Sequence, residues 1–206
     1  MTRSWLPALN TQLSEPLSKS GIVKVMRNNK GIILWFTGLP AAGKTTVATR
    51  VYQHLKRRGA NVQLLDGDVL RKMHPQPLGY SREERISHVN RVGNAALKLK
   101  EEGEVCIVAI IAPYREVRDV VFQRIGAVEI FADAALEVCI ARDPKGLYAR
   151  ALKGEILNFT GIGDPYDPPL TPVIHLRTDI ESPEESTRRV LEYLLDQGWI
   201  DTVEGC

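Results

Sequence analysis

From Gly31 onward, short apolar runs alternate with longer amphipathic stretches of helical length. The apolar runs are rich in β-branched residues and are bounded by turn-forming residues; they are "GIILWFTG" (31–38), "NVQLLDGD" (61–68), "EVCIVAIIA" (104–112), "AVEIFADA" (127–134) and "PVIHLRT" (172–178). Nearly continuous apolar strands separated by helices are typical of a parallel sheet that is covered on both faces. We therefore predict an α/β protein with three layers, α/β/α, around a mostly parallel central sheet.

Two of the helical stretches carry their own boundary signals. Ser81 and Glu84 have the spacing of a capping box, and Gly103 marks the end of the helix that they begin. Ser182 and the following proline begin a second helix in the same way. Residues 1–28 show no sustained periodicity, so we predict an N-terminal extension there and one domain over residues 29–206.

Composition fits a single globular domain and excludes some partners. The chain has 206 residues, of which 44% are apolar and 25% charged, and its net charge is +2. So mild a charge favours neither nucleic acid nor an anionic membrane as a partner. No run reaches the roughly 18 apolar residues of a membrane span, and the first residues lack a secretory signal. Cys106 and Cys139 lie within apolar runs, which is typical of free buried thiols, so we expect a cytoplasmic protein.

The segment "GLPAAGKTT" matches the P-loop pattern G-x-x-x-x-G-K-[ST] between a predicted strand and a predicted helix. Its glycines let successive backbone N–H groups face a phosphate, while Lys44 reaches the β- and γ-phosphates and the Thr45 hydroxyl binds Mg²⁺. The candidate ATP-binding residues are Gly38, Leu39, Pro40, Ala41, Ala42, Gly43, Lys44, Thr45 and Thr46.

Asp66 and Asp68 follow the second predicted strand, which we expect to lie beside the first. Open α/β sheets bind their ligands at this carboxyl edge. One carboxylate can hold Mg²⁺ while the other accepts a proton from a substrate hydroxyl, as phosphoryl transfer requires. The catalytic candidates are thus Lys44, Asp66 and Asp68, and the metal candidates are Thr45 and Asp66. The alternative is that the two aspartates form a solvated Asp-Gly turn.

Six segments in order resemble the adenylylsulfate (adenosine 5′-phosphosulfate, APS) kinases: "GLPAAGKTT", "DGDVLR", "LGYSREER", "APYREVRD", "RDPKGLYARALKGEILNFTGI" and "DPYDPP". The resemblance covers roughly residues 31–197. It implies a P-loop kinase that uses ATP and Mg²⁺ to phosphorylate the 3′-hydroxyl of APS, giving PAPS in sulfate assimilation. It also implies a homodimer and a possible functional association with ATP sulfurylase.

The resemblance assigns roles to substrate-site residues. Arg71, Arg85 and Lys145 resemble the cations that hold the phosphosulfate, and Tyr80 and Phe159 resemble the aromatic pair around the substrate adenine. Guanidinium groups suit sulfate and phosphate oxygens, and planar bases favour stacking. The alternatives are that Arg71 and Arg85 form surface ion pairs and that Tyr80 and Phe159 are core aromatics.

Other positions match or depart from the family pattern. Arg142 resembles the residue against the ATP adenine, and Asp68 belongs to the substrate site as well as to the catalytic group. His88 stands where the family usually has a substrate-binding asparagine, and it can still donate one hydrogen bond. Ala112 replaces a family serine once proposed to carry a phosphoryl group, so this sequence favours direct transfer at that position.

Residues 143–169 combine glycines and prolines with several aromatic and apolar residues. In a P-loop kinase such a segment resembles a mobile lid that closes over both nucleotides and excludes water. An ordinary packed loop is the alternative.

Two other functions stay open at this point. One is a P-loop kinase for another small hydroxyl acceptor, such as a sugar acid or a nucleotide. The other is a non-catalytic nucleotide-sensing module, against which the joint presence of Lys44, Thr45, Asp66 and Asp68 argues.

Overall fold

A computed structural model describes residues 31–72 and 79–201, and the extension predicted at residues 1–28 lies outside them. The five predicted strands form one sheet in which every neighbouring pair is parallel. Their order is β2-β3-β1-β4-β5, with β1 at Ile32–Thr37, β2 at Val62–Asp66, β3 at Val105–Ala109, β4 at Ala127–Asp133 and β5 at Ile174–Arg177. The predicted α/β class is therefore confirmed.

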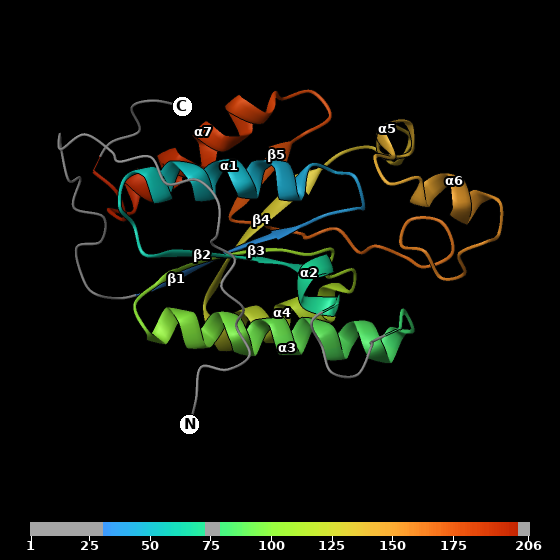
Figure 1. Ribbon diagram of the computed structural model, residues 1–206, viewed down its shortest axis with the longest axis horizontal. Helices are drawn as coiled ribbons and strands as arrows, with labels where there is room; N and C mark the ends of the chain where they lie inside the picture. The colour runs from blue at the N-terminus through green and yellow to red at the C-terminus, as the bar shows by residue number, and fades with distance from the viewer. Residues whose placement is uncertain (1–30, 73–78, 202–206) are drawn as a thin grey trace.

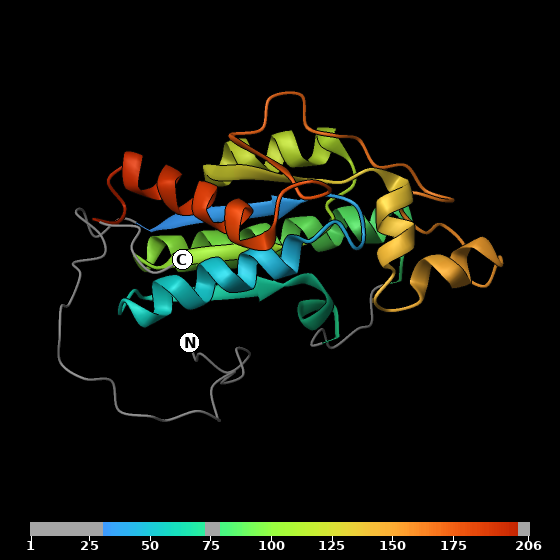
Figure 2. The ribbon, with the colours of Figure 1, turned by 90° about the horizontal axis from the view of Figure 1, so that it is seen from above.

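Helices cover both faces of this sheet, and further helices lie beyond the carboxyl ends of its strands (Figure 1). The helices are α1 (Lys44–Arg57), α2 (Gly67–Lys72), α3 (Arg82–Glu101), α4 (Arg115–Ile125), α5 (Leu136–Arg142), α6 (Leu147–Leu152) and α7 (Pro183–Asp196). Helices α1 and α7 lie on one face and α3 and α4 on the other, which gives the predicted three layers. Helices α5 and α6 lie beyond the carboxyl ends of the strands, as Figures 1 and 2 both show.

The central strand β1 explains why the sequence pattern is continuous rather than alternating. Leu34 and Phe36 pack in the core on the side of α1 and α7, while Ile33 and Trp35 pack on the side of α3 and α4. Side chains of a strand point alternately to its two faces, so a strand with helices on both faces buries every residue.

The predicted helix starts are present as full capping boxes. Ser81 Oγ accepts a hydrogen bond from the backbone N–H of Glu84, whose carboxylate accepts one from the N–H of Ser81. Ser182 and Glu185 make the same reciprocal pair at the start of α7. Each box satisfies N–H groups that have no partner within the helix, and so fixes where it begins.

The expectation that the second strand lies beside the first is wrong, because β3 separates them. All five residues of β3 are buried, whereas Gln63 of β2 is exposed. The more apolar strand occupies the interior of the sheet and β2 forms an edge. Within the described part of the chain, no helix is both long and apolar enough to cross a membrane.

Candidate active site

A cavity of about 860 Å³ opens at the carboxyl edge of the sheet. It brings together most of the residues that the sequence singles out: Pro40, Ala41, Gly43, Lys44, Thr45, Thr46, Asp66, Asp68, Arg71, Tyr80, Arg85, His88, Arg142, Lys145 and Phe159. Gly38, Leu39 and Ala42 belong to the same P-loop but are not among the lining residues. Ligands of open α/β sheets bind in this position.

The P-loop has a backbone shape that few residue types allow. Gly38 has φ 147° and Gly43 has φ 87°, and a Cβ at Gly38 would lie 2.3 Å from the carbonyl oxygen of Ala132. A side chain at Gly38 would therefore collide with β4 as well as strain the backbone. Ala41 also has a positive φ of 59°, which adds to the curvature of the loop.

Lys44 is buried and its side chain lies along the P-loop. Its Nζ donates hydrogen bonds to the carbonyl oxygens of Gly38 at 3.0 Å and Leu39 at 2.7 Å. Burial lowers the pKa of Lys44 to about 8, although the carboxylates of Asp68 and Asp66 oppose this shift. The ammonium group is thus held within the phosphate-binding loop and loses its proton more readily than an ordinary lysine.

Asp66 is part of a helix start rather than of a solvated turn. One of its carboxylate oxygens accepts hydrogen bonds from the backbone N–H groups of Asp68 at 2.9 Å and Val69 at 3.3 Å, which caps α2. The other accepts one from Thr45 Oγ1 at 3.2 Å. The alternative that the Asp-Gly pair forms a simple turn is therefore wrong.

Thr45 and Asp66 suit Mg²⁺, because this ion prefers hard oxygen ligands and usually takes only one or two carboxylates from a protein. Among the residues that the structure describes, no group of three or more His, Cys, Asp or Glu side chains could hold a metal ion. Protein-bound Mg²⁺ generally takes its remaining ligands from water and substrate phosphates.

Asp68 forms an ion pair with Lys145, which joins α2 to the start of the segment predicted as a lid. Both side chains are mostly exposed, so solvent weakens their attraction. The hydrogen bond to Asp68 raises the pKa of Lys145. Asp68 thus lines the cavity, and its carboxylate pairs with the side chain of Lys145.

Arg71, Tyr80 and Arg85 form a cluster that also lines the cavity. The guanidinium carbons of Arg71 and Arg85 lie 4.7 and 5.5 Å from the centroid of the Tyr80 ring. Tyr80 is 58% exposed, so it is not a core aromatic. Arg85 is only 6% exposed and donates hydrogen bonds to the carbonyl oxygens of Tyr80 and Asn158, so it does not form a surface ion pair.

Phe159 serves the core and the cavity at once. Its ring packs edge-on against Tyr148, with centroids 5.0 Å apart, and it also lines the cavity. The Tyr148 hydroxyl donates a hydrogen bond to the carbonyl oxygen of Pro40 in the P-loop. At the far end of the same segment, Tyr114 donates to the Asp164 carboxylate at 2.9 Å. Residues 143–169 are thus packed at both ends, and the mobility of a lid stays a prediction.

Two positions that depart from the family pattern are buried at the cavity. His88 lines it from α3. Ala112 lines it after β3 with a positive φ of 45°, and its carbonyl oxygen accepts a hydrogen bond from the buried Arg118.

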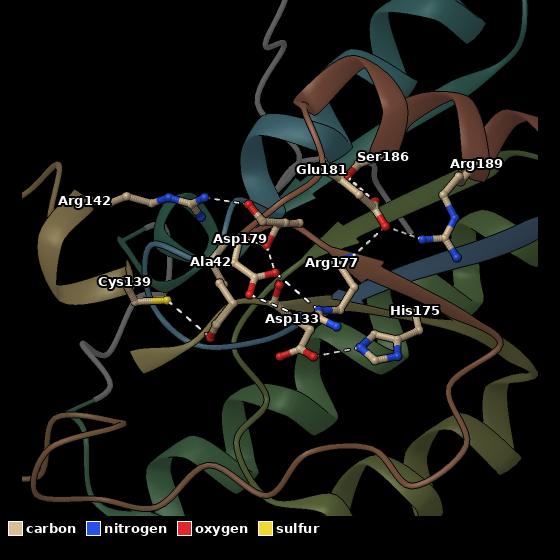
Figure 3. A network of polar contacts seen from close by, with 12 residues as sticks. Ala42, Asp133, Cys139, Arg142, His175, Arg177, Asp179, Glu181, Ser186 and Arg189 are labelled. Carbon is tan, nitrogen blue, oxygen red and sulfur yellow. Dashed lines mark hydrogen bonds and ion pairs between the residues drawn. The ribbon is translucent and has the colours of Figure 1, made fainter. Parts of the chain in front are cut away.

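Sequence reasoning missed the loop after β5. Thr178 and Glu181 line the cavity, and Arg142 donates a hydrogen bond to the carbonyl oxygen of Thr178 at 2.5 Å. The network around them joins the P-loop, β4, β5 and α7 (Figure 3). The available signal was that Thr178 ends the fifth predicted strand, at the same edge of the sheet as the P-loop.

The Adenylylsulphate kinase family model matches residues 30–177 of this chain. The chain belongs to the adenylylsulfate kinase family. This is a family of kinases, so the resemblance carried by the six motifs and the prediction of an enzyme are confirmed.

Individual adenylylsulfate kinases are similar over most of their length. That of Halothermothrix orenii is 47% identical over 180 residues, which cover 87% of this chain and 97% of the relative. That of Picosynechococcus is 46% identical over 173 residues, covering 84% and 98%. The structure of the Mycobacterium tuberculosis APS kinase in complex with AMPPNP and APS is 38% identical, with a TM-score of 0.76, and the match covers 80% of this chain and 98% of that one.

Proposed function

We propose that this protein is an adenylylsulfate kinase that transfers the γ-phosphoryl group of ATP to the 3′-hydroxyl of APS, giving PAPS and ADP. The observation that carries the proposal is the shared cavity. It places the P-loop and the carboxylate of Asp68 next to the cluster of Arg71, Tyr80 and Arg85.

The donor side consists of the P-loop, Thr45 and Asp66. Backbone N–H groups of the loop and the Lys44 ammonium bind the phosphates, where they stabilise the charge that spreads over the transferring group. Thr45 and Asp66 would hold Mg²⁺, which supplies positive charge against the phosphate oxygens.

On the acceptor side, Asp68 is the proton acceptor. Asp66 already accepts three hydrogen bonds, from Thr45, Asp68 N–H and Val69 N–H, whereas the carboxylate of Asp68 is mostly exposed and pairs with Lys145. The 3′-hydroxyl gives its proton to Asp68 as its oxygen bonds to the γ-phosphorus, and the bond from that phosphorus to the leaving oxygen of ADP breaks. Ala112 has no hydroxyl, so no phosphoryl group is carried at that position.

The basic and aromatic cluster favours APS over other acceptors. A P-loop and two carboxylates alone would serve a sugar acid equally well. Arg71 and Arg85 close to the exposed Tyr80 ring suit a ligand that has both a base and an anionic group. APS has a base, an anionic tail and a free 3′-hydroxyl.

A coupled ADP-release assay with a panel of acceptors tests the proposal. We expect kcat/KM for APS to exceed the values for AMP, shikimate and gluconate by at least about 100-fold, the scale reached when a wrong ligand leaves a polar site unpaired. Lys44→Ala is the inactive control, with turnover lower by about 100-fold or more. Equal use of AMP or of a sugar acid would remove the APS assignment, and no acceptor-dependent ADP release would favour a nucleotide sensor.

We also propose a cytoplasmic homodimer that associates functionally with ATP sulfurylase. The buried free thiols of Cys106 and Cys139 support a reducing compartment, and the resemblance to the family supports the dimer. Light scattering on the purified protein tests the dimer, since a single monomer mass at micromolar concentration would contradict it. Co-purification with ATP sulfurylase from cell extract tests the association.

A further inference from the structure

Thr178 lies directly after β5 and connects parts of the cavity that are far apart in the sequence. Its backbone N–H donates to the carbonyl oxygen of Asp133 at 2.8 Å, and its own carbonyl oxygen accepts from Arg142. Its hydroxyl lies 2.8 Å from the carbonyl oxygen of Ala42 in the P-loop and 2.8 Å from that of Asp133. Figure 3 labels the residues that supply these contacts, Ala42, Asp133 and Arg142.

The Thr178 hydroxyl has only one proton to donate to the two carbonyl oxygens. The carbonyl oxygen of Asp133 already accepts a hydrogen bond from the backbone N–H of Thr178. The bond to Ala42 O is therefore the distinct contribution of this side chain. Thr178 is only 7% exposed, so the bond is shielded from water.

This bond sets the direction of the Gly43 N–H group in the P-loop. In a planar trans peptide the C=O and N–H groups point in opposite directions. The Ala42 carbonyl points to Thr178, so the N–H of Gly43 points away from Thr178. Gly43 lines the cavity, whereas Ala42 is not among the lining residues.

The peptide between Ala42 and Gly43 needs such a contact. Ala41 has φ 59° and Gly43 has φ 87°, and glycine accepts several backbone conformations about equally well. A Cβ placed on Gly43 would lie 3.7 Å from Cβ of Thr178, so the threonine side chain packs directly behind this peptide. Packing and the hydrogen bond together select one orientation.

We propose that Thr178 is a positioning residue for the donor nucleotide. Its hydroxyl orients the Gly43 N–H toward the phosphates. The carbonyl oxygen of Thr178 accepts a hydrogen bond from Arg142, so Thr178 also connects the P-loop to the end of α5 at the same cavity. The proposal rests on the proposed function in that the donor is a nucleoside triphosphate.

Thr178→Val tests it, because valine has the shape of threonine without the hydroxyl. We expect the Kd for Mg-ADP, measured by titration calorimetry, and the KM for ATP to rise by about tenfold, as for the loss of one buried hydrogen bond. The KM for APS should stay within about twofold, and Thr178→Ser, which keeps the hydroxyl, should restore Mg-ADP affinity to within about threefold.

Thr187→Val is the matched control. Thr187 is also buried and also donates its hydroxyl hydrogen bond to a backbone carbonyl, that of Pro183 at 2.6 Å, but it does not line the cavity. Loss of the Thr187 hydroxyl should leave the Kd for Mg-ADP within about twofold of the wild type.

Three results would overturn the proposal: unchanged Mg-ADP affinity in Thr178→Val, an equal loss in Thr187→Val, or an equal rise in KM for ATP and APS. Circular dichroism checks folding, and if Thr178→Val does not fold, Thr178→Ala is judged by the same measurements. Mg-ADP binding needs no acceptor. Failure of the wild type to phosphorylate APS would thus overturn the proposed function while calorimetry still decides the role of Thr178.

Discussion

At the scale of single residues, the protonation of Lys44 links burial to nucleotide binding. The side chain lies against two P-loop carbonyl oxygens, and burial lowers its pKa to about 8. Below this pH the ammonium is charged and attracts phosphates. As pH rises through 8, Lys44 of the free enzyme loses this charge. Binding of a polyanion then requires that Lys44 be protonated again, which costs free energy and weakens the affinity.

We therefore predict that Mg-ADP binds progressively more weakly to the wild type as pH rises from about 8 to about 9.5. The reason is that the fraction of free enzyme with a protonated Lys44 falls over this range. Titration calorimetry across this range measures the effect. Lys44→Arg is the control, since arginine keeps its charge throughout and its Kd should not follow the same slope. A wild-type Kd that is constant over the range would contradict the prediction.

Whether a site residue could be predicted depended on whether it belongs to a local sequence motif and on how far along the chain its contacts lie. Lys44, Thr45 and Asp66 were predictable because each belongs to a local pattern with a known chemical purpose. The place of Thr178 at a strand end was predictable, but its contact with Ala42 was not, because Ala42 is 136 positions away and no local pattern marks the contact. The packing of Phe159 against Tyr148 was also hidden, since an aromatic residue in a loop suits a core and a stacking site equally well.

At the scale of helices and strands, the residues at which an element begins were more predictable than which strands lie side by side in the sheet. The capping boxes at Ser81 and Ser182 fixed two helix starts, and the apolar runs gave all five strands. The order of the strands was not predictable in full, because it depends on which runs are buried along their whole length. The capping of α2 by Asp66 was missed because the Asp-Gly pair suits a turn as well as a helix start.

The first turn of α3 carries a prediction about the acceptor. Arg85 donates a hydrogen bond to Asn158 O at 2.6 Å and lies 3.7 Å from the Asp164 carboxylate, so it joins α3 to residues 143–169. Arg85→Ala should raise the KM for APS far more than that for ATP, because the change removes both a cation of the cavity and this connection. Steady-state kinetics with each substrate varied in turn measures the difference.

Arg82→Ala is the matched control in the same helical turn. Arg82 is half exposed, pairs with Glu116 at 2.6 Å and stacks on Tyr114, but it does not line the cavity. Exposed ion pairs contribute little, so both KM values should stay within about twofold. An Arg85→Ala effect confined to ATP, or an equal effect of Arg82→Ala, would contradict the assignment of Arg85 to the acceptor side.

At the scale of the whole molecule, the fold collects distant segments at one edge of the sheet. The P-loop follows β1, Asp66 ends β2, Ala112 follows β3, and Thr178 follows β5, so parallel strands bring all of them to the same side. Parallel order therefore explains why a single cavity contains nearly every residue that the motifs predicted. The P-loop and its flanking pattern made the fold class predictable, while the packing of residues 143–169 across the cavity was visible only in three dimensions.

The same arrangement predicts how the protein tolerates loss of its N-terminal segment. Every candidate site residue lies between Gly38 and Ser186, and residues 1–25 contain none of the phosphate or acceptor motifs. Deleting residues 1–25 should therefore leave turnover with ATP and APS within about threefold of the full-length value, as expected when no group that stabilises the transition state is removed. The coupled ADP-release assay measures this, with circular dichroism to check folding. A truncated protein that is folded but inactive would show that the segment takes part in the reaction, and the site would then extend beyond the carboxyl edge of the sheet.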